Sequence, residues 1–204
     1  MNKLHTKEQK MRRRIVNKAF NLMSKKGIDA VSMREIAQHI GVTKPVLYYY
    51  FKDKEDLCKS IIGEGVADFN KALMEAYAKG APLHELAVFA FKTHKEFFLK
   101  DKKNASFVLH LLSYSLNGKK GSQTFFRVKS ERKHLFDELL KNAERAGAIP
   151  KNSGRDIVHL ISAVIAHFIL NSYNFEFQFD EDFPQRMTDI IFLGVREYYK
   201  GNKK

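Results

Sequence analysis

The stretch VTKPVLYYYFKDK, residues 42–54, is rich in side chains that can donate a hydrogen bond. A threonine hydroxyl, three consecutive phenols and three lysine ammonium groups can all donate to an anionic oxygen. A phenol does so at a small cost in entropy, because its ring is rigid. Pro45 and Val46 place two apolar side chains among these donors. The chemistry that this segment predicts is non-covalent recognition of phosphate and of a surface beside it.

Positive charge is concentrated in the same part of the chain. The protein has 204 residues and a formal net charge of +13. Residues 1–60 hold 14 Lys and Arg against 6 Asp and Glu, a net +8, and the other 144 residues hold 22 against 17, a net +5. A basic segment of this kind indicates a polyanionic partner. A general excess of charge that keeps the protein soluble is the alternative interpretation.

Composition excludes several classes of protein. Apolar residues make up 44% of the chain, enough for a buried core, but no apolar run reaches the length of a membrane span. The basic start lacks the apolar run of a signal peptide. Cys58 is the single cysteine, so we expect no intramolecular disulfide and a reducing compartment. We therefore expect no contact with a membrane.

Apolar residues recur mostly at spacings of three and four, and Gly and Pro are few, so the sequence predicts an all-α fold. Ser32, Thr43 and Asp53 are candidate N-caps, and Glu35 completes a capping box with Ser32. Gly27 and Gly41 fit helix C-termini. The helices that we expect run over about 7–26, from Ser32 to Gly41, about seven residues after Thr43, and about 53–78, 83–100, 104–116, 122–146, 155–172 and 184–200.

The two short helices on either side of Gly41 form a helix-turn-helix pattern. The second helix of such a pair places its first residues in the major groove of DNA. A small core would hold the two helices at a fixed angle: Ile36, Ala37, Ile40, Val42, Leu47 and Phe51. Lys44 could donate to guanine, whereas Pro45 and Val46 suit a thymine methyl group, and Tyr48 lies at the same exposed start. The expected phosphate contacts are Thr43, Tyr49, Tyr50, Lys52 and Lys54. For Tyr49, packing against its own domain is an equal alternative.

The segment SMREIAQHIGVTKPVLYYYFKDKEDL, residues 32–57, resembles the DNA-binding domain of TetR-family transcriptional regulators. With the first helix, the resemblance covers about residues 10–62. Pro45 departs from it, because many members carry glycine there, but proline suits a first helical turn. The resemblance rests on Ile36-Ala37, Gly41-Val42, Thr43, Leu47-Tyr48, Tyr50-Phe51, Lys54 and Leu57.

The resemblance implies roles for individual residues. Thr43, Tyr48, Tyr50 and Lys54 match positions that contact phosphates, and Lys44, Pro45 and Val46 match positions that face bases. Arg34 matches a position that can also meet the DNA backbone. The arginines at 12–14 could reach a minor groove, although a solvated helix face is the more favoured interpretation.

The resemblance also implies the domain order. Residues 1–62 would form a three-helix DNA-binding domain, and residues 63–204 a helical ligand-binding and dimerisation domain, with the helix from about 53 linking them. Similar proteins are homodimers. Independently, IVHLISAVIAHFIL, residues 157–170, is apolar nearly all round and must be buried on every side. A monomer with this helix as its core is the alternative. The expected interface residues are Ile161, Ala163, Ile165, Ala166, Ile190, Ile191, Leu193 and Gly194.

The resemblance further implies that the second half holds a pocket for a small apolar or aromatic effector. Plain core is the alternative for each residue of the candidate lining, which is Phe107, His110, Leu111, Tyr114, Phe125, Phe126, Val164, Phe168 and Tyr173. The resulting hypothesis is a homodimeric repressor in the bacterial cytoplasm, at the nucleoid, which a small-molecule effector releases from an inverted-repeat operator in double-stranded DNA. A helix-turn-helix dimer governed by a protein partner or by its own abundance is the alternative.

Catalysis is not expected. The sequence contains no G-x-S-x-G, no G-x-x-x-x-G-K-[ST] and no H-E-x-x-H motif. With one cysteine and scattered histidines, we expect no metal site and no cofactor. RNA binding is less favoured than DNA binding, because the aromatic and basic residues lie on a short capped helix rather than on a sheet.

Overall fold

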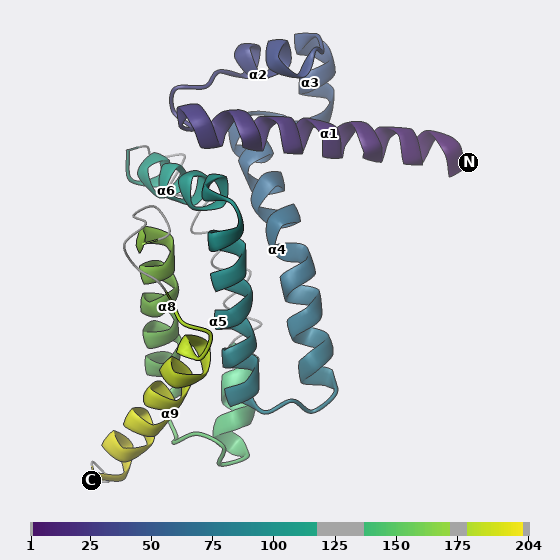
Figure 1. Cartoon of the computed structure of the whole chain (residues 1–204). Helices are drawn as coiled ribbons and strands as arrows, with labels where there is room; N and C mark the ends of the chain where they lie inside the picture. Colours follow the sequence, from purple (N-terminus) through teal and green to yellow (C-terminus); the bar gives the residue numbers. More distant parts are fainter. Residues whose placement is uncertain (1, 118–136, 172–178, 202–204) are drawn as a thin grey trace. The chain divides into compact units, whose positions relative to one another are not determined.

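The computed structural model describes residues 2–117, 137–171 and 179–201 of the chain. These residues are helical and form no strand, so the predicted all-α class is confirmed (Figure 1). Residues 137–145 are also helical. The helices with defined bounds are α1 (Asn2–Lys26), α2 (Met33–Ile40), α3 (Lys44–Tyr50), α4 (Lys54–Ala78), α5 (Leu83–Lys100), α6 (Lys102–Asn117), α8 (Gly154–Asn171) and α9 (Phe183–Gly201).

The chain divides into two compact units. The first contains α1, α2, α3, the start of α4 up to Ala67, and α6 from Lys103; the second contains the rest of α4 with α5, α8 and α9. Helix α6 thus groups with the N-terminal helices, whereas the sequence pattern assigned residues 104–116 to the second domain. The predicted domain boundary at residue 62 stays a prediction.

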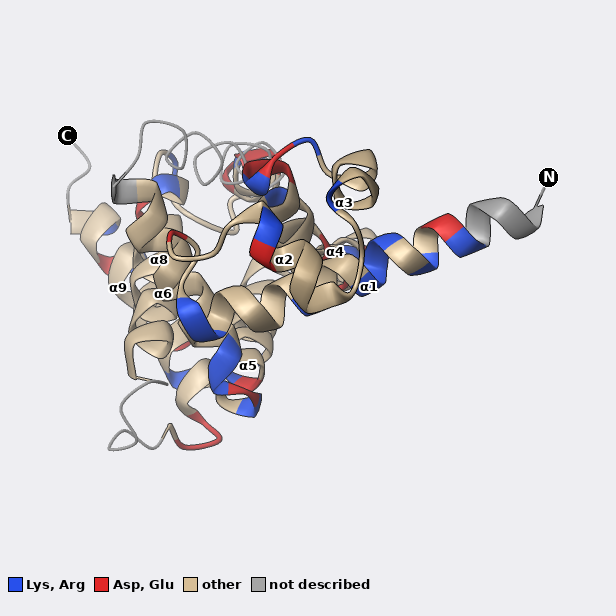
Figure 2. Cartoon of the chain, turned by 90° about the horizontal axis from the view of Figure 1, so that it is seen from above, with Lys and Arg blue, Asp and Glu red and all other residues tan. Residues whose placement is uncertain are grey.

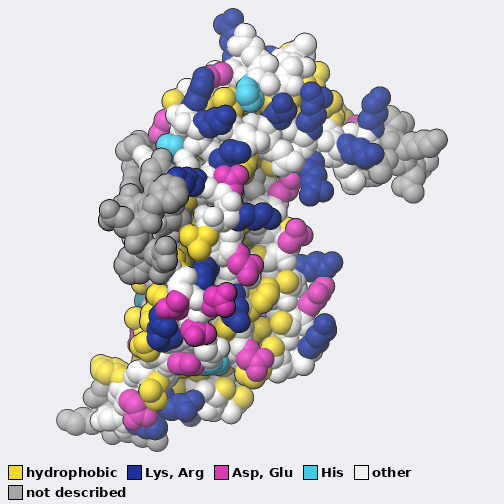
Figure 3. Space-filling model, in the orientation of Figure 1, with side chains coloured by type: hydrophobic (Ala, Val, Ile, Leu, Met, Phe, Trp, Pro, Cys, Tyr) yellow, Lys and Arg dark blue, Asp and Glu magenta, His cyan; other side chains and the backbone are white. Residues whose placement is uncertain are grey.

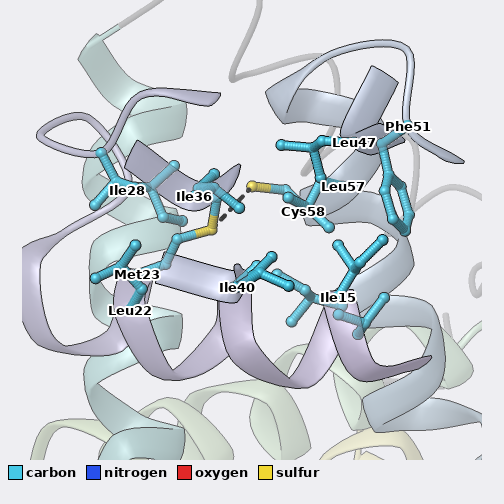
Figure 4. Close-up of a cluster of buried hydrophobic side chains, with 14 of the residues drawn as sticks. Ile15, Leu22, Met23, Ile28, Ile36, Ile40, Leu47, Phe51, Leu57 and Cys58 are labelled. Carbon is cyan, nitrogen blue, oxygen red and sulfur yellow. Dashed lines mark hydrogen bonds between the residues drawn. The ribbon is translucent and has the colours of Figure 1, made fainter. Parts of the chain in front are cut away.

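The first unit is built around one apolar core to which every helix of the unit contributes. Figure 4 shows side chains from α1, α2, α3 and α4 converging on it. Leu47 and Phe51 anchor α3 and its end in this core, and Phe107 and Leu111 bring in α6. The predicted helix-turn-helix core is therefore confirmed as part of a larger one, with Ile36, Ala37, Ile40, Leu47 and Phe51 buried and Val42 packed at its edge.

Local hydrogen bonds fix the turns around the two short helices. The Ser32 hydroxyl accepts from the Glu35 N–H at 3.1 Å, as the capping box predicts. The Glu35 carboxylate does not return the bond; it accepts from Lys26 at 2.6 Å, because a charged donor is the stronger partner. Gly41 adopts φ 79°, and the N–H groups of Gly41 and Val42 both donate to the Ala37 carbonyl. This left-handed turn directs the chain from α2 into α3.

The second unit is held by aromatic packing. Helices α5, α8 and α9 pack on one another. Phe168 of α8 lies edge-on to Phe91 of α5, to Phe179 and to Phe183 of α9, with ring centroids 6.3, 4.5 and 5.4 Å away. Such tilted contacts are the preferred geometry for aromatic pairs.

Candidate nucleic-acid interface

Helix α3 has one buried and one open face. Leu47 is fully buried, whereas Tyr48 and Tyr49 on the same helix are 47% and 70% exposed. The residues that the sequence predicted to face bases, Lys44, Pro45 and Val46, are all exposed. The core therefore fixes the helix by its inner side and leaves its donors and apolar contacts open to a partner. Arg34, Thr43 and Lys52 are exposed as well.

Thr43 is at the N-cap of α3, but its hydroxyl is not used there. Its backbone is extended, with φ −77° and ψ 156°, and the side chain makes no capping hydrogen bond. Pro45 in the first turn removes one N–H that would otherwise need a partner. A phosphate oxygen can therefore accept from the Thr43 hydroxyl and from N–H groups of the first turn.

The three tyrosines have different surroundings. Tyr50 packs at the edge of the apolar core, which is the position of a structural residue. The Tyr49 ring lies edge-on to Tyr50, with centroids 5.0 Å apart and planes at 89°. The Tyr49 hydroxyl donates to the carboxylate of Glu8 in α1 at 3.0 Å, and this bond raises the pKa of Tyr49. Tyr48 has its ring open to solvent. Tyr48 and Tyr49 are thus at the surface, and Tyr50 is turned inward.

Lys54 also has an internal role. Its ammonium group donates to the carbonyls of Ile28, Val31 and Asp29 at 2.8, 3.0 and 3.4 Å, and it lies 5.4 Å from the centre of the Tyr114 ring. The start of α4 thereby holds the loop between α1 and α2. The ammonium group thus already has protein acceptors. The phosphate contact expected of Lys54 stays a prediction.

Two arginines of the predicted arm also stabilise the first unit. Arg12 donates to Ser60 at 2.6 Å and to Glu64 at 3.1 Å, both in α4, and its guanidinium covers the ring of Phe51. Arg14 donates to the Ile40 carbonyl at the end of α2. Arg13 is exposed on α1. Arg12 and Arg14 therefore bond to their own domain, which is expected neither of a free arm nor of a fully solvated helix face.

Basic side chains surround this surface. Lys and Arg follow α1 (Figure 2), and they are dense over the region of α1, α2 and α3 (Figure 3). Helix α3 itself is mostly uncharged in Figure 2, because phenols and apolar groups take most of its positions. A surface of this kind combines attraction for phosphates with neutral groups that can contact base edges.

The predicted effector residues are divided between the two units. In the first, Phe107 and Leu111 are buried in its core, Tyr114 lies beside Lys54, and His110 packs against Gly27, where an added Cβ would lie 3.4 Å from the imidazole. In the second, Phe168 is buried among aromatic rings and Val164 is half-buried. The other predicted residues, Phe125, Phe126 and Tyr173, lie outside the described residues.

Among the described residues, polar side chains line a surface hollow on each of two helical stretches. One of about 410 Å³ lies over α1, and one of about 240 Å³ lies on the stretch 138–145. Their lining residues are Lys10, Arg13, Arg14, Asn17, Lys18 and Asn21 for the first, and Glu138, Lys141, Asn142 and Arg145 for the second. Charged and amide side chains make up both linings, whereas apolar and aromatic side chains predominate in a typical ligand pocket.

The predicted dimer residues mostly lie at the surface of α8 and α9. Ile190 and Leu193 are 56% and 61% exposed, and Ala163, Ala166 and Gly194 are exposed too. Ile161 and Ile165 are half-buried, and Ile191 is buried within its own unit. Leu160 and Leu170 of α8, which were not predicted, are exposed apolar residues. The sequence signal that could have added them to the predicted interface was their position on a helix that is apolar nearly all round.

Other chemistry is limited within the described residues. Burial raises the pKa of the Cys58 thiol to about 12, and its sulfur lies 3.9 Å from that of Met23 in the core. No three His, Cys, Asp or Glu side chains in the described ranges are placed to hold a metal ion. None of the helices searched in those ranges combines the length and apolar character needed to cross a membrane.

Comparison with known proteins agrees with this geometry. A family model described as "Bacterial regulatory proteins, tetR family" matches residues 15–61, the stretch that carries the DNA contacts predicted from Arg34 to Lys54. The HTH-type transcriptional regulator AcrR of Shigella flexneri is 36% identical over 80 residues, which are 38% of this chain and 37% of AcrR. The chain thus spans little more than a third of that relative's length.

Longer matches cover nearly the whole chain. The negative transcriptional regulator IcaR of the biofilm operon icaADBC in Staphylococcus epidermidis is 23% identical over 192 residues, 93% of this chain and 100% of IcaR. The structure of the transcriptional regulator FadR from Bacillus subtilis in complex with stearoyl-CoA matches with a TM-score of 0.74 and 19% identity, covering 89% of this chain and 98% of that one. The latter likeness shows a shared fold.

Proposed function

Because the chain belongs to the TetR family of bacterial transcriptional regulators, we propose that it is a homodimeric repressor, which a small apolar or aromatic effector releases from an inverted-repeat operator. The observation that carries this proposal is the outward face of α3. There Lys44, Pro45 and Val46 are exposed at the start of a helix whose inner side is fixed by buried Leu47.

The residues of this face divide into two tasks. The Lys44 ammonium group donates to the N7 and O6 acceptors of guanine, and Pro45 and Val46 contact a thymine methyl group. Thr43 and Tyr48 donate to phosphates and fix the register of the helix in the groove. Lys52 and Arg34, both exposed, add charge along the backbone. This charge raises the affinity for any duplex, so specificity rests on the first turn of α3.

Exposed apolar side chains on α8 and α9 support the homodimer. Ile190 and Leu193 would cost free energy in water, and burial against a second copy removes that cost. Ala163, Ala166 and Gly194 are small and allow two helices to approach closely. A two-fold dimer presents two α3 helices, and these suit half-sites about 34–36 Å apart on one side of the duplex.

Helices α4 and α6 are suited to carry the effector signal. Helix α4 contributes residues to both units, and α6 places Phe107 and Leu111 in the core that supports α3. Ser106 also donates to the Ser24 carbonyl in α1 at 2.6 Å. An effector that binds the released state more tightly than the DNA-bound state would shift α4 and α6 and so reduce occupancy of the operator.

A second candidate function is a dimer governed by a protein partner or by its own abundance. Two observations favour it: aromatic rings pack around Phe168 in the second unit, and polar side chains line both of the hollows described above. In both candidates the protein acts on chromosomal DNA in the bacterial cytoplasm.

The two candidates are separated by measuring release from DNA. Purified protein would be bound to an operator selected from random duplex DNA, and the number of chains per duplex would be determined by analytical ultracentrifugation. A panel of aromatic compounds and stearoyl-CoA, the ligand of the similar FadR structure, would then be titrated in. Release of two chains by one compound supports the effector; retention under the whole panel supports the partner model. Release unchanged after α4 is cross-linked to α5 would contradict movement of α4.

A further inference from the structure

An acidic residue touches the surface that we assign to DNA. Glu8 is the single acidic residue in α1, among nine Lys and Arg. Its carboxylate accepts from the Tyr49 hydroxyl at 3.0 Å, across 41 positions of sequence. Tyr49 is 70% exposed on α3, and its ring is fixed edge-on by Tyr50, which packs on the core. The Tyr49 phenol is therefore held at the surface by an acid from another helix.

This arrangement opposes phosphate binding in two ways. A phenol has one proton to donate, so a phosphate oxygen can accept it only after Glu8 has lost it. A phosphate near the Tyr49 hydroxyl also lies near the Glu8 carboxylate, and the like charges repel. The hydrogen bond to an ionised acceptor is stronger than one to a neutral group, so the phenol does not leave it freely.

We propose that Glu8 sets the DNA affinity of this protein by competing with phosphate for the hydroxyl of Tyr49. This proposal rests on the role of α3 at DNA. Glu8 lowers affinity for operator and random duplex alike, because phosphates carry no sequence information. The ratio between specific and non-specific binding is left unchanged, while the dwell time on every sequence is shortened. Glu8 is thus a positioning residue that acts through Tyr49.

The first test is Glu8→Gln, which keeps an oxygen acceptor and removes the charge. We expect affinity for a selected operator and for random duplex to rise together, by about threefold to tenfold at low salt. The gain should shrink as salt is added, because exposed charges are screened. Glu96→Gln is the matched control, since it makes the same change of charge on an exposed residue of α5. Unchanged or weaker binding by Glu8→Gln would overturn the proposal.

The second test asks whether Glu8 acts through Tyr49. In a Tyr49→Phe background, the fold-gain in DNA affinity from Glu8→Gln should be smaller than in the wild type by a factor of about two or more, because no phenol is released. An equal gain in both backgrounds would overturn the route through Tyr49. In the free protein, Glu8→Gln should also lower the pKa of Tyr49, seen as loss of a high-pH phenol in an ultraviolet titration.

The proposed function can fail separately. A wild-type protein that binds random duplex but selects no operator would remove the operator hypothesis, and the Glu8 tests on random duplex would still decide this inference. A wild-type protein that binds no duplex at all would overturn both.

Discussion

Helix α3 and the α8–α9 pair both present exposed faces, but the side chains on them suit different partners. On α3 and its N-cap the open face carries phenols, a threonine and a lysine beside the apolar Pro45 and Val46. On α8 and α9 it carries Leu170, Ile190 and Leu193. The first can bind an anion with little burial of apolar surface, whereas the second gains only by excluding water.

This contrast predicts different responses to conditions. Binding through α3 should weaken steeply with salt, because phosphate contacts release counterions. Pairing through α8 and α9 should depend on protein concentration and hardly on salt. The predictions that follow test each face, starting with the largest expected effect.

Replacing Leu47 should remove the support of α3. Leu47 is fully buried, and Leu47→Ala should lower the free energy of unfolding by about 2–5 kcal/mol, because it leaves a cavity in the core. Circular dichroism in increasing urea measures this loss. Its neighbour Val46 is exposed, and Val46→Ala should change stability by less than about 0.5 kcal/mol. Equal losses in the two variants would mean that α3 is not held by its inner side.

Charges on α9 should separate the copies. In a variant with Ile190→Glu and Leu193→Glu, two carboxylates would enter the proposed apolar interface, and sedimentation should show monomers. Operator affinity should fall by about 100-fold or more, because the second half-site is no longer bound by a linked chain. Arg196→Glu, on an exposed residue of the same helix, is the control that should stay dimeric. A dimer that survives both glutamates would place the interface elsewhere.

Lys44 and Lys52 should differ in what they contribute to DNA binding. Lys44→Ala should cost about 1–3 kcal/mol at one base pair and relax the selected sequence there. Lys52→Ala should weaken all sequences alike and lower the salt slope by about one. Selection from random duplex DNA with each variant distinguishes the two effects. An unchanged motif with Lys44→Ala would refute base reading by this residue.

Lys54 should matter for stability in a way that Lys52 does not. Its ammonium group serves three carbonyls of the α1–α2 loop, so Lys54→Ala should lower the free energy of unfolding by about 1 kcal/mol. Lys52 makes its bond to Asp56 through the backbone N–H, so Lys52→Ala should leave stability nearly unchanged. Thermal unfolding of both variants compares them directly. A stability loss in Lys52→Ala alone would reverse these assignments.

The smallest effect concerns pH. Lys26 lowers the pKa of the Glu35 carboxyl from its usual 4.5, mainly through their hydrogen bond. A lowered pKa means that the bond stabilises the fold above pH 4.5, and that this contribution is lost as the pH falls through the value in the folded protein. Glu35→Gln should therefore make the melting temperature slightly less sensitive to acid. A melting temperature that becomes more sensitive to acid in Glu35→Gln would contradict a stabilising ion pair between Lys26 and Glu35.

Local signals explain which parts of the fold were predictable. Ser32, Gly41 and Asp53 each fix a helix end through atoms within a few residues, so those helices were predictable from sequence. The exposure of the first turn of α3 was predictable as well, because Leu47 was expected in the core and is buried there. Lys54 was different, because its acceptors lie 23 to 26 positions away, and a basic residue beside a recognition helix predicts a phosphate contact equally well.

Long-range packing explains the rest. The place of α6 in the first unit depends on Phe107 and Leu111, whose pattern fits any amphipathic helix. The contact of Glu8 with Tyr49 spans 41 residues, and the only signal for it was a lone acid in a basic helix. The predicted effector pocket rested mainly on the family resemblance, because aromatic residues at helical spacing fit a pocket and a filled core equally well.

The central claim is that two copies of α3 read DNA as a two-fold pair. Selection of bound sequences from random duplex DNA at physiological salt tests it most directly. An enriched inverted repeat with half-sites about one helical turn apart is the predicted result. Enrichment of no sequence, with binding that salt alone abolishes, would contradict the claim and leave only attraction between a basic surface and phosphate.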